Sequence, residues 1–294
     1  MTSWRLLNRG CGQRLHPDWV NVDVYASAPS VIVHDLRRQL PFESNTFDVV
    51  YHSHVLEHFR RSEAPHFLAE CRRVLRPGGG NRIAVPDLEQ IARLYLEMLE
   101  RARVGDEAGR NNYEWMMIEL FDQTVRDHSG GGHGQYFDRD VVPNIDFVVK
   151  RQGVEVERAL ALRSARRERS TDSLENSQPS GSIHKRARRM ARRLIDKMDS
   201  TRKKPLREHL IRVLLGSEYE LLGLGRFKRS GELHYWMYDS YSLSVALSSA
   251  GFTAPRRVGA TESRIPNWVS FNLDTEPSGR VYKPDSLFME GIKE

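Results

Sequence analysis

The sequence contains only two cysteines among its 294 residues, and it lacks any long apolar run. Cys11 and Cys71 are too few for a framework of disulfide bonds, so we expect a protein of the reducing cytosol. No apolar stretch approaches the length of a membrane span, which excludes a chain that crosses a bilayer. The N-terminal residues also lack the long apolar core of a signal peptide. The sequence therefore predicts a cytoplasmic protein.

Excess charge of one sign is confined to a single segment. The whole chain carries a formal charge of +6, but 17 Lys and Arg stand against 6 Asp and Glu between Arg158 and Arg212. That local balance of +11 leaves the rest of the chain at about −5. The basic character therefore belongs to this segment, and an anionic partner would bind there.

The basic segment has two parts. Residues 170–182 are polar and lack periodicity, which predicts a mobile linker. Residues 183–198 place apolar side chains at helical spacing with Arg and Lys opposite, which predicts a basic amphipathic helix. This helix either packs its apolar stripe on the protein with the arginines in water, or lies as a peripheral contact on an anionic membrane surface. Nucleic acid is the least favoured of its partners.

The first apolar run, Trp4 to Asn8, leads into a turn with two glycines, Gly10-Cys11-Gly12. Backbone without a Cβ lets a nucleotide-type ligand come close. A pyrophosphate site would need a third glycine and then a helix, but Leu15 stands at that position. Only residues 13–19 separate the turn from the next apolar run, too few for a normal crossover helix. The pattern favours an adenosine that carries no phosphates.

Two acids follow at the ends of the next expected strands. Asp23 ends the run 20–24 and could accept hydrogen bonds from both ribose hydroxyls; the alternative is a turn or capping aspartate. Residues 30–36 indicate a third strand that ends in Asp35, which could accept from an adenine amino group with Leu36 against the ring. A capping role for Asp35 is an equal alternative.

A fourth strand at 47–51, a helix at 64–74 and a strand at 82–85 complete this half of the chain. With them, the sequence resembles the S-adenosylmethionine (SAM)-dependent methyltransferases of class I, and specifically their type 11 branch. The resemblance covers residues 5–90 in the right order. The pieces that carry it are LNRGCG, NVD, LPFESNTFDVVYHSHVLEHF and ECRRVLRPGGG with RIAVPDL.

The resemblance implies a fold, a cofactor and a set of contacts. The fold is an α/β, Rossmann-like, doubly wound sheet of seven mostly parallel strands, to which the charge pattern adds a helical, partly disordered basic insertion. SAM would be the cofactor. The implied contacts are the SAM loop at Gly10, Cys11 and Gly12, the ribose at Asp23, the adenine at Asp35 and Leu36, and the methionine half with its sulfonium at Ser53 and His54. The sequence departs from the usual branch pattern at Asn8, where an acid is common, and at Arg14, where a further glycine is common.

The C-terminal part contains the pieces GELHYWMYD, YSL, AGF, SRIP and KPDSLFME. With these it resembles a less common subgroup of the same branch, and the resemblance does not fix the acceptor. A helix is expected at 241–250, and the last two strands near 256–260 and 287–292. The expected organisation is therefore a SAM-binding half at 1–100, a helical insertion at 101–230, and a C-terminal part at 231–294 that completes the sheet.

The chemistry of such a site needs few groups. A sulfonium methyl is already a strong electrophile, so the protein mainly positions the reactants and supplies a base. His54 is the best-placed base because it directly follows the fourth strand; His58 is the other histidine nearby. His54, Glu57 and His58 have a spacing that suits a metal, but no metal is expected, and Glu57 with His58 is interpreted as a structural pair.

The acceptor pocket is expected from two later segments. Glu119, Asp122, Gln123 and Arg126 share one helical face, which by default is exposed, although the glycine-rich stretch 128–134 after it could carry a closing lid. The block 234–239 is the second segment, or else a packed stretch that leads to a helix capped by Asp239. The candidate catalytic residues are His54, His234, Tyr238 and Arg126.

Three functions fit these patterns. The first is a methyltransferase that acts on a small-molecule or glycan acceptor, with O-methylation as the expected chemistry. The second is an RNA or protein methyltransferase that grips its substrate with the basic insertion. The third is a non-catalytic adaptor that retains the fold.

Overall fold

The computed structural model describes residues 4–175 and 204–294, in two compact units. The first unit joins residues 1–158 to 231–294, and the second is 159–230. The two units are described separately. The helices between 107 and 152 pack within the first unit.

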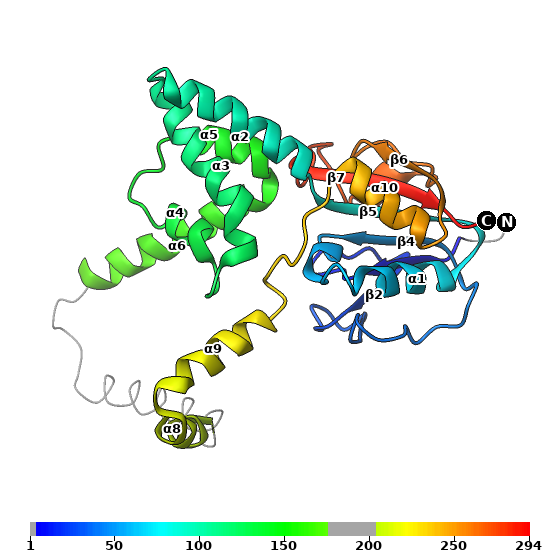
Figure 1. Cartoon of the computed structure of the whole chain (residues 1–294), viewed down its shortest axis with the longest axis horizontal. Coiled ribbons are helices and arrows are strands. Elements are labelled where there is room, and N and C mark those ends of the chain that lie inside the picture. The colour runs from blue at the N-terminus through cyan, green and yellow to red at the C-terminus, as the bar shows by residue number, and fades with distance from the viewer. Residues whose placement is uncertain (1–3, 176–203) are drawn as a thin grey trace. The chain divides into compact units, whose positions relative to one another are not determined.

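The first unit is built on one sheet of seven strands (Figure 1). Its order is β3-β2-β1-β4-β5-β7-β6, and neighbouring strands are parallel from β3 to β5, whereas β7 is antiparallel to both β5 and β6. This confirms the Rossmann-like, mostly parallel seven-stranded sheet that the sequence predicts. The strands are β1 (Leu6–Arg9), β2 (Trp19–Asp23), β3 (Val31–Val33), β4 (Phe47–Ser53), β5 (Leu75–Pro86), β6 (Thr253–Val258) and β7 (Ser286–Ile292).

The connections between the first three strands of the chain are unusually short. Residues 10–18, between β1 and β2, form turns and no helix, as the sequence predicts from their number. Residues 24–30 likewise join β2 to β3 without a helix. The face that such crossover helices would cover must therefore be buried by another part of the chain.

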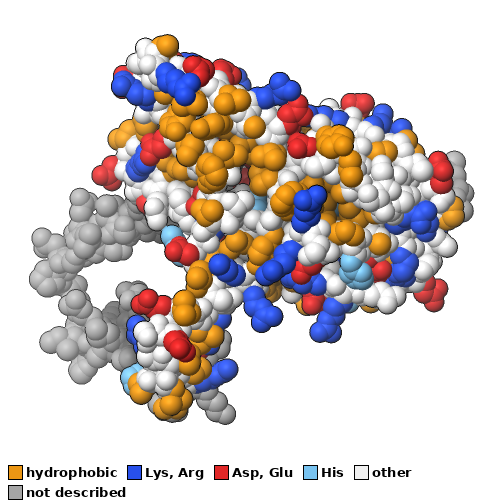
Figure 2. Space-filling view, in the orientation of Figure 1, with side chains coloured by type: hydrophobic (Ala, Val, Ile, Leu, Met, Phe, Trp, Pro, Cys, Tyr) orange, Lys and Arg blue, Asp and Glu red, His pale blue; other side chains and the backbone are white. Residues whose placement is uncertain are grey.

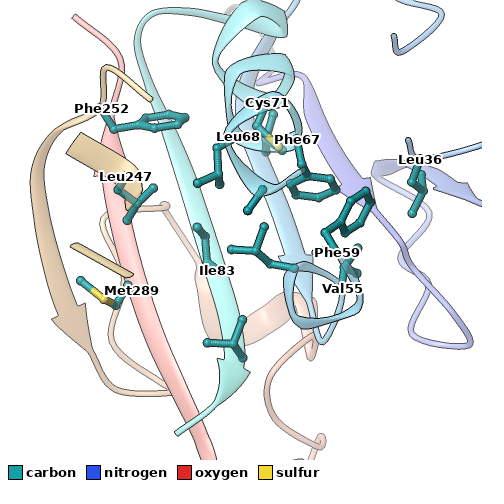
Figure 3. Packing of buried hydrophobic residues seen from close by; sticks show 14 of the residues in the cluster. Leu36, Val55, Phe59, Phe67, Leu68, Cys71, Ile83, Leu247, Phe252 and Met289 are labelled. Atoms are coloured by element: carbon teal, nitrogen blue, oxygen red, sulfur yellow. The ribbon is translucent and has the colours of Figure 1, made fainter. Parts of the chain in front are cut away.

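Helices α1 (Ala64–Val74) and α10 (Ser240–Ser249) cover one face of the sheet. Figure 3 shows Phe67, Leu68 and Cys71 of α1 pointing toward the strands, with Leu247 of α10 beside Met289 of β7. α10 begins at Asp239, whose side chain accepts from the Ser242 amide in a capping box. The expected helices at 64–74 and 241–250 are thus confirmed, the second with its start one residue earlier.

An aromatic cluster from three distant segments buries the opposite face. Trp268 belongs to the short helix η3 (Trp268–Phe271) and packs with Trp19 of β2 and Tyr51 of β4. The ring centroids lie 6.0 Å apart for Trp19 and Tyr51, 6.1 Å for Trp19 and Trp268, and 5.2 Å for Tyr51 and Trp268, and the first two pairs meet edge to face. This cluster occupies the face from which the first crossover helix is missing.

Beneath the aromatic cluster, Arg82 is fully buried and paired with two acids. Its Nε donates to Asp274 at 2.9 Å and its Nη1 to Glu290 at 3.0 Å. The Tyr51 hydroxyl donates to the other oxygen of Asp274 at 2.5 Å. The network joins β4, β5 and β7 to the segment that contains Asp274. It therefore fixes this C-terminal segment against the sheet.

Helices beyond the carboxyl end of β5 complete the first unit: α2 (Leu88–Arg103), α3 (Glu107–Val125), α4 (Gly131–Phe137) and α5 (Ile145–Gln152). Asp87 caps α2 through the Gln90 amide. Figure 2 shows hydrophobic side chains gathered over α2 and α3, where Leu96 and Phe121 are exposed.

Helix α6 (Val154–Glu175) runs from the first unit into the second, which also contains α8 (Lys204–Leu215), η2 (Gly216–Glu218) and α9 (Tyr219–Lys228). Residues 170–175, expected in a linker, instead continue α6. The rest of that linker and the amphipathic helix expected at 183–198 lie outside the described residues. Among the helices of residues 4–175 and 204–294, none has both the length and the apolar composition that a bilayer crossing requires.

The Arg82 network yields a prediction on stability. Asp274→Ala leaves a buried guanidinium with one acid instead of two, so unfolding in urea should require about 3–5 kcal/mol less free energy than for the wild type. The exposed pair Arg103–Glu100 supplies the control, because Glu100→Ala should change stability by less than about 0.5 kcal/mol. Equal losses in the two variants would contradict the assigned role of the network.

His52 yields a prediction on pH. Its ring is buried against Phe67, neither ring nitrogen has a hydrogen-bond partner among the described residues, and burial together with Arg9 lowers its pKa to about 3. The unfolded imidazole binds a proton below about pH 6.5 and the folded one does not, so its contribution is complete above that pH and is lost as the pH falls toward 3. His52→Phe should therefore remove about 2 kcal/mol of the stability loss between pH 7.5 and pH 5.

Urea unfolding at the two pH values measures this difference. His66→Gln is the matched control, because His66 is exposed on α1. An acid-induced loss in His52→Phe as large as in the wild type would show that His52 does not cause it.

Candidate functional site

The two glycines after β1 serve different purposes. Both have left-handed backbone, with φ of +77° at Gly10 and +52° at Gly12. A Cβ on Gly10 would lie 2.4 Å from Val55 Cγ2 and 3.3 Å from Leu36 Cδ1, so this glycine makes room for the protein's own side chains. A Cβ on Gly12 would meet nothing within 4 Å. Gly12 is therefore the position at which the turn faces open space.

Asp23, at the end of β2, holds the turn from the side. Its Oδ2 accepts from the Gly12 amide at 2.7 Å, and its Oδ1 accepts from the Val24 amide at 2.7 Å. The residue is only half-buried, and each carboxylate oxygen can accept more than one hydrogen bond. Asp23 thus combines the turn role with the capacity to accept from a ligand beside Gly12.

The other predicted cofactor residues surround the same turn. Asp35 is exposed and accepts from the Arg37 amide at 3.0 Å, which is a turn-capping contact. Leu36 is buried in the core next to Gly10. The pairing of Asn8 with Tyr51 in β1 and β4 brings the glycine turn level with Ser53.

The thiol of Cys11 lies within this turn. It is buried, and burial together with the nearby Asp23 raises its pKa to about 12. Cys11 therefore stays protonated and acts here as a small packing group. Both cysteines are free thiols.

A cavity of about 340 Å³ lies at the carboxyl ends of β4 and β5. Its walls come from the segment after β4, from α2 and α3, from the start of α6, and from two C-terminal stretches around 231–237 and 283–285. The residues that line it are His54, His58, Pro86, Ile91, Glu119, Gln123, Arg126, Gln152, Glu155, Gly231, Glu232, His234, Met237, Lys283 and Asp285. Three of the four predicted catalytic residues, His54, His234 and Arg126, are thus brought together.

His54 is held in place at both ring nitrogens. Its Nε2 shares a hydrogen bond of 2.8 Å with Ser286 Oγ, and its Nδ1 lies 3.1 Å from Glu57 Oε1 without the alignment of a hydrogen bond. Its backbone is left-handed, with φ of +53°, a strained region that is common at functional sites. Burial, and then the charge of Lys283, lower the pKa of His54 to about 3, so the ring is neutral.

Glu57 and His58 lie in η1 (Leu56–His58), directly after His54 and Val55. The His58 ring packs edge-on against His234, with centroids 4.8 Å apart, and its Nδ1 donates to the Leu233 carbonyl at 2.9 Å. Glu57 is fully buried, and burial raises its pKa. The sequence interpreted Glu57 and His58 as a pair, whereas folding places His234 with them.

The charged face of α3 is buried, so the default expectation of an exposed face is wrong. Glu119 is 6% exposed and pairs with Arg151 of α5; Asp122 is 9% exposed and pairs with Arg126 and His133. Helices α4 and α5 cover this face, which the helical periodicity of α3 alone does not reveal. A Cβ at Gly131 would lie 2.5 Å from Asp122 Oδ1, so the glycines before α4 allow it to pack closely.

Charged groups that the sequence did not single out complete the wall. Lys283 Nζ pairs with Glu155 at 2.7 Å, and Gln152 donates to Asp285 Oδ2 at 3.0 Å. Asp285 Oδ1, Arg126 Nε and His234 Nδ1 are buried without a hydrogen-bond partner among the described residues. Because unpaired buried polar atoms are costly, they indicate a cavity that takes a polar ligand.

Tyr238 does not line the cavity, which corrects its predicted place in the acceptor wall. It is 3% exposed and packs in the core cluster with Leu243. Met237 lines the cavity, whereas Tyr238, the next residue, pairs its backbone with Asp87 and turns its side chain into the core. Burial and then Glu57 raise the pKa of Tyr238 to about 12.

One family comparison gives a clear match. Residues 11–81 match the family described as "Methyltransferase domain", Methyltransf_11. The match lies inside the stretch 5–90, for which the sequence resembles the type 11 branch, and it confirms that resemblance. No curated protein matches the chain.

Similar solved structures include the PH0226 protein of Pyrococcus horikoshii OT3, with 26% identity and a TM-score of 0.26 over 31% of this chain and 53% of the other. A second is a 1,6-didemethyltoxoflavin-N1-methyltransferase of Burkholderia thailandensis with bound S-adenosylhomocysteine. It has 20% identity and a TM-score of 0.25 over 29% of this chain and 45% of the other. A third is a SAM-dependent methyltransferase of Mesorhizobium loti, with 19% identity and a TM-score of 0.25 over 29% of this chain and 47% of the other. The chain spans about half the length of these structures.

The contrast between the two glycines is testable by stability alone. Alanine in left-handed backbone costs about 1–2 kcal/mol at either position. Gly10→Ala also forces Val55 to move, which adds about 1–3 kcal/mol, so its free energy of unfolding should fall clearly further than that of Gly12→Ala. Urea unfolding of both variants measures the difference, and a larger loss in Gly12→Ala would refute the assigned packing.

Proposed function

We propose that this chain, whose residues 11–81 match the Methyltransferase domain family, transfers a methyl group from SAM to a small polar acceptor bound in the cavity at His54 and His234. The observation that carries the proposal is the position of this cavity. It opens at the carboxyl ends of β4 and β5, next to the strand β1 that ends in the glycine turn. In sheets of this kind, ligands bind at the carboxyl edge where the strand order reverses.

The glycine turn is suited to the cofactor side. Gly12 faces open space and Asp23 keeps acceptor capacity beside it, as binding of a ribose requires. Ser53 lies level with the turn, and His54 comes one residue later at the cavity wall. A cofactor that extends from Asp23 past Ser53 would therefore direct its methyl group toward the cavity.

The cavity is suited to a small acceptor rather than to a large one. Its volume of about 340 Å³ is at the lower end of the usual range for small-molecule sites. Its walls combine the cations Arg126 and Lys283 with the acids Glu155 and Asp285. This mixture of donors and acceptors favours an acceptor with several hydroxyl groups, such as a sugar or another polyol-like metabolite, and thus O-methylation.

His54 is the proposed catalytic base. It lines the cavity directly after β4, and contacts at both ring nitrogens fix its orientation. Nε2 would exchange its hydrogen bond with Ser286 Oγ for one with the acceptor hydroxyl and take up its proton, and the Glu57 carboxylate, 3.1 Å from Nδ1, is placed to stabilise the protonated ring. Arg126 and His234 would position the acceptor, since each has an unpartnered buried nitrogen on the described cavity wall.

We keep the cytosol as the proposed location because both cysteines are free thiols. Contact of residues 183–198 with an anionic membrane stays a sequence-based prediction, since they lie outside the described part of the chain.

Binding of S-adenosylhomocysteine tests the cofactor site. Asp23→Ala removes the carboxylate that would accept from the ribose, so isothermal titration should show affinity reduced by about 10- to 100-fold. Asp18→Ala is the control, because this aspartate side chain is 73% exposed before β2. Unchanged affinity in Asp23→Ala would overturn the assigned cofactor pocket. Methyl transfer from tritiated SAM to fractionated extract would then identify the acceptor, and its failure with every fraction would contradict the activity.

A further inference from the structure

We propose that Glu57, His58 and His234 bind one divalent transition-metal ion, of the zinc class, at the wall of the acceptor cavity. Each of the three offers one ligand atom, and these atoms all lie within 4.8 Å of one another. Two of the residues, His58 and His234, line the cavity itself. A site of two histidines and one carboxylate is a common set of zinc ligands in enzymes.

The first support is that the cluster is buried and unsatisfied. Glu57 is 0% exposed and His234 is 4% exposed. Neither oxygen of Glu57, nor Nδ1 of His234, has a hydrogen-bond partner among the residues that the structure describes. A carboxylate buried in this way is costly unless a cation compensates its charge. His54 Nδ1 lies 3.1 Å from Glu57 Oε1, without the alignment of a hydrogen bond.

The second support is that the ligands are held in place by the backbone. Tyr235 donates its amide hydrogen to the Glu57 carbonyl at 2.7 Å, and the His234 amide donates to the Gln123 carbonyl at 2.9 Å. His58 donates from Nδ1 to the Leu233 carbonyl, so its Nε2 keeps a lone pair for a metal. Such outer contacts fix the tautomer and the orientation of metal-binding histidines.

The distances leave a small closure to make. Zinc bonds of about 2.0–2.2 Å in tetrahedral geometry place donors about 3.4 Å apart, so the ligand atoms would close by about 1.4 Å at most. Side-chain rotations would suffice for this closure, since backbone hydrogen bonds already hold η1 beside the segment around His234. Nitrogen donors favour zinc-class ions over magnesium and calcium, which prefer oxygen.

Three protein ligands leave at least one coordination position for another group. Because His58 and His234 face the cavity, that position opens toward the acceptor. This second step rests on the proposed function: a hydroxyl of the acceptor that binds there would lose its proton more easily, and His54 would take it up. The sequence considered His54, Glu57 and His58 for a metal, whereas in the fold His54 turns to Ser286 and His234 takes its place.

The test uses the full chain without an affinity tag, stripped of metals. Isothermal titration with Zn²⁺ should give one site with a dissociation constant below about 1 µM, and Co²⁺ should produce the visible absorption of a four- or five-coordinate complex. Glu57→Gln and His234→Asn should each weaken zinc binding by at least about 100-fold. His128→Asn is the control, since His128 and Asp127 form an exposed pair that could bind zinc on the surface.

Thermal unfolding keeps the test decisive for the variants. Zinc should raise the Tm of the wild type and of His128→Asn, and it should leave that of Glu57→Gln unchanged. Without zinc, Glu57→Gln should be at least as stable as the wild type, because it removes an uncompensated buried carboxylate. If Glu57 had only a structural role, Glu57→Gln would instead be less stable than the wild type without zinc. Wild-type zinc affinity in Glu57→Gln and His234→Asn, or no binding below about 100 µM in the wild type, would overturn the proposal.

The same titrations separate the two proposals. S-adenosylhomocysteine binding without zinc binding removes the metal site and leaves the methyltransferase function. Zinc binding without S-adenosylhomocysteine binding removes the methyltransferase function and leaves the metal site.

Discussion

The hydrogen bonds that Tyr235 and Trp236 donate to the Glu57 carbonyl join the two halves of the candidate site. One half follows β4 and carries His54, Glu57 and His58; the other precedes α10 and carries His234. The register set by these bonds decides which side chains meet. It directs His234 and Met237 toward the cavity and Tyr238 into the core, and it brings the His234 ring against His58. Both the acceptor cavity and the metal-binding cluster depend on this junction.

Local chemistry made the sheet predictable. The glycine turn, the acid at the end of β2 and the short stretch 13–19 depend on neighbouring residues only, and the structure has the strands and the missing helix where these patterns predict them. The capping box at Asp239 is also local. The roles of the individual cofactor residues stay predictions. The structure adds that, of the two glycines in the turn, Gly10 makes room for core side chains and Gly12 faces open space.

What the sequence did not reveal depends on contacts between distant segments. The periodicity of α3 shows that Glu119 and Arg126 share a face, but not that α4 and α5 cover it. Lys283 and Asp285 reach the cavity only because β7 runs antiparallel to β5, which brings its first residue beside Pro86. Likewise, no spacing in the sequence connects His234 with Glu57. Acceptor sites of this kind are assembled by topology, so residue patterns identify the cofactor half first.

The chain carries two kinds of buried charge, and the difference between them separates stability from function. Arg82 donates hydrogen bonds to both Asp274 and Glu290, and the Tyr51 hydroxyl donates to Asp274. The buried charge of Arg82 is therefore compensated inside the protein. Glu57 has no such compensation among the described residues, and neither do Asp285 Oδ1 and Arg126 Nε. A fold that satisfies Arg82 so fully has the means to satisfy Glu57 as well. Leaving the polar atoms of one cavity unpaired costs stability that only a bound ligand returns. Unpaired groups also occur elsewhere, as at His52, but those of the cavity wall lie together where a ligand could pair with them, which is why the two proposals start from this cavity.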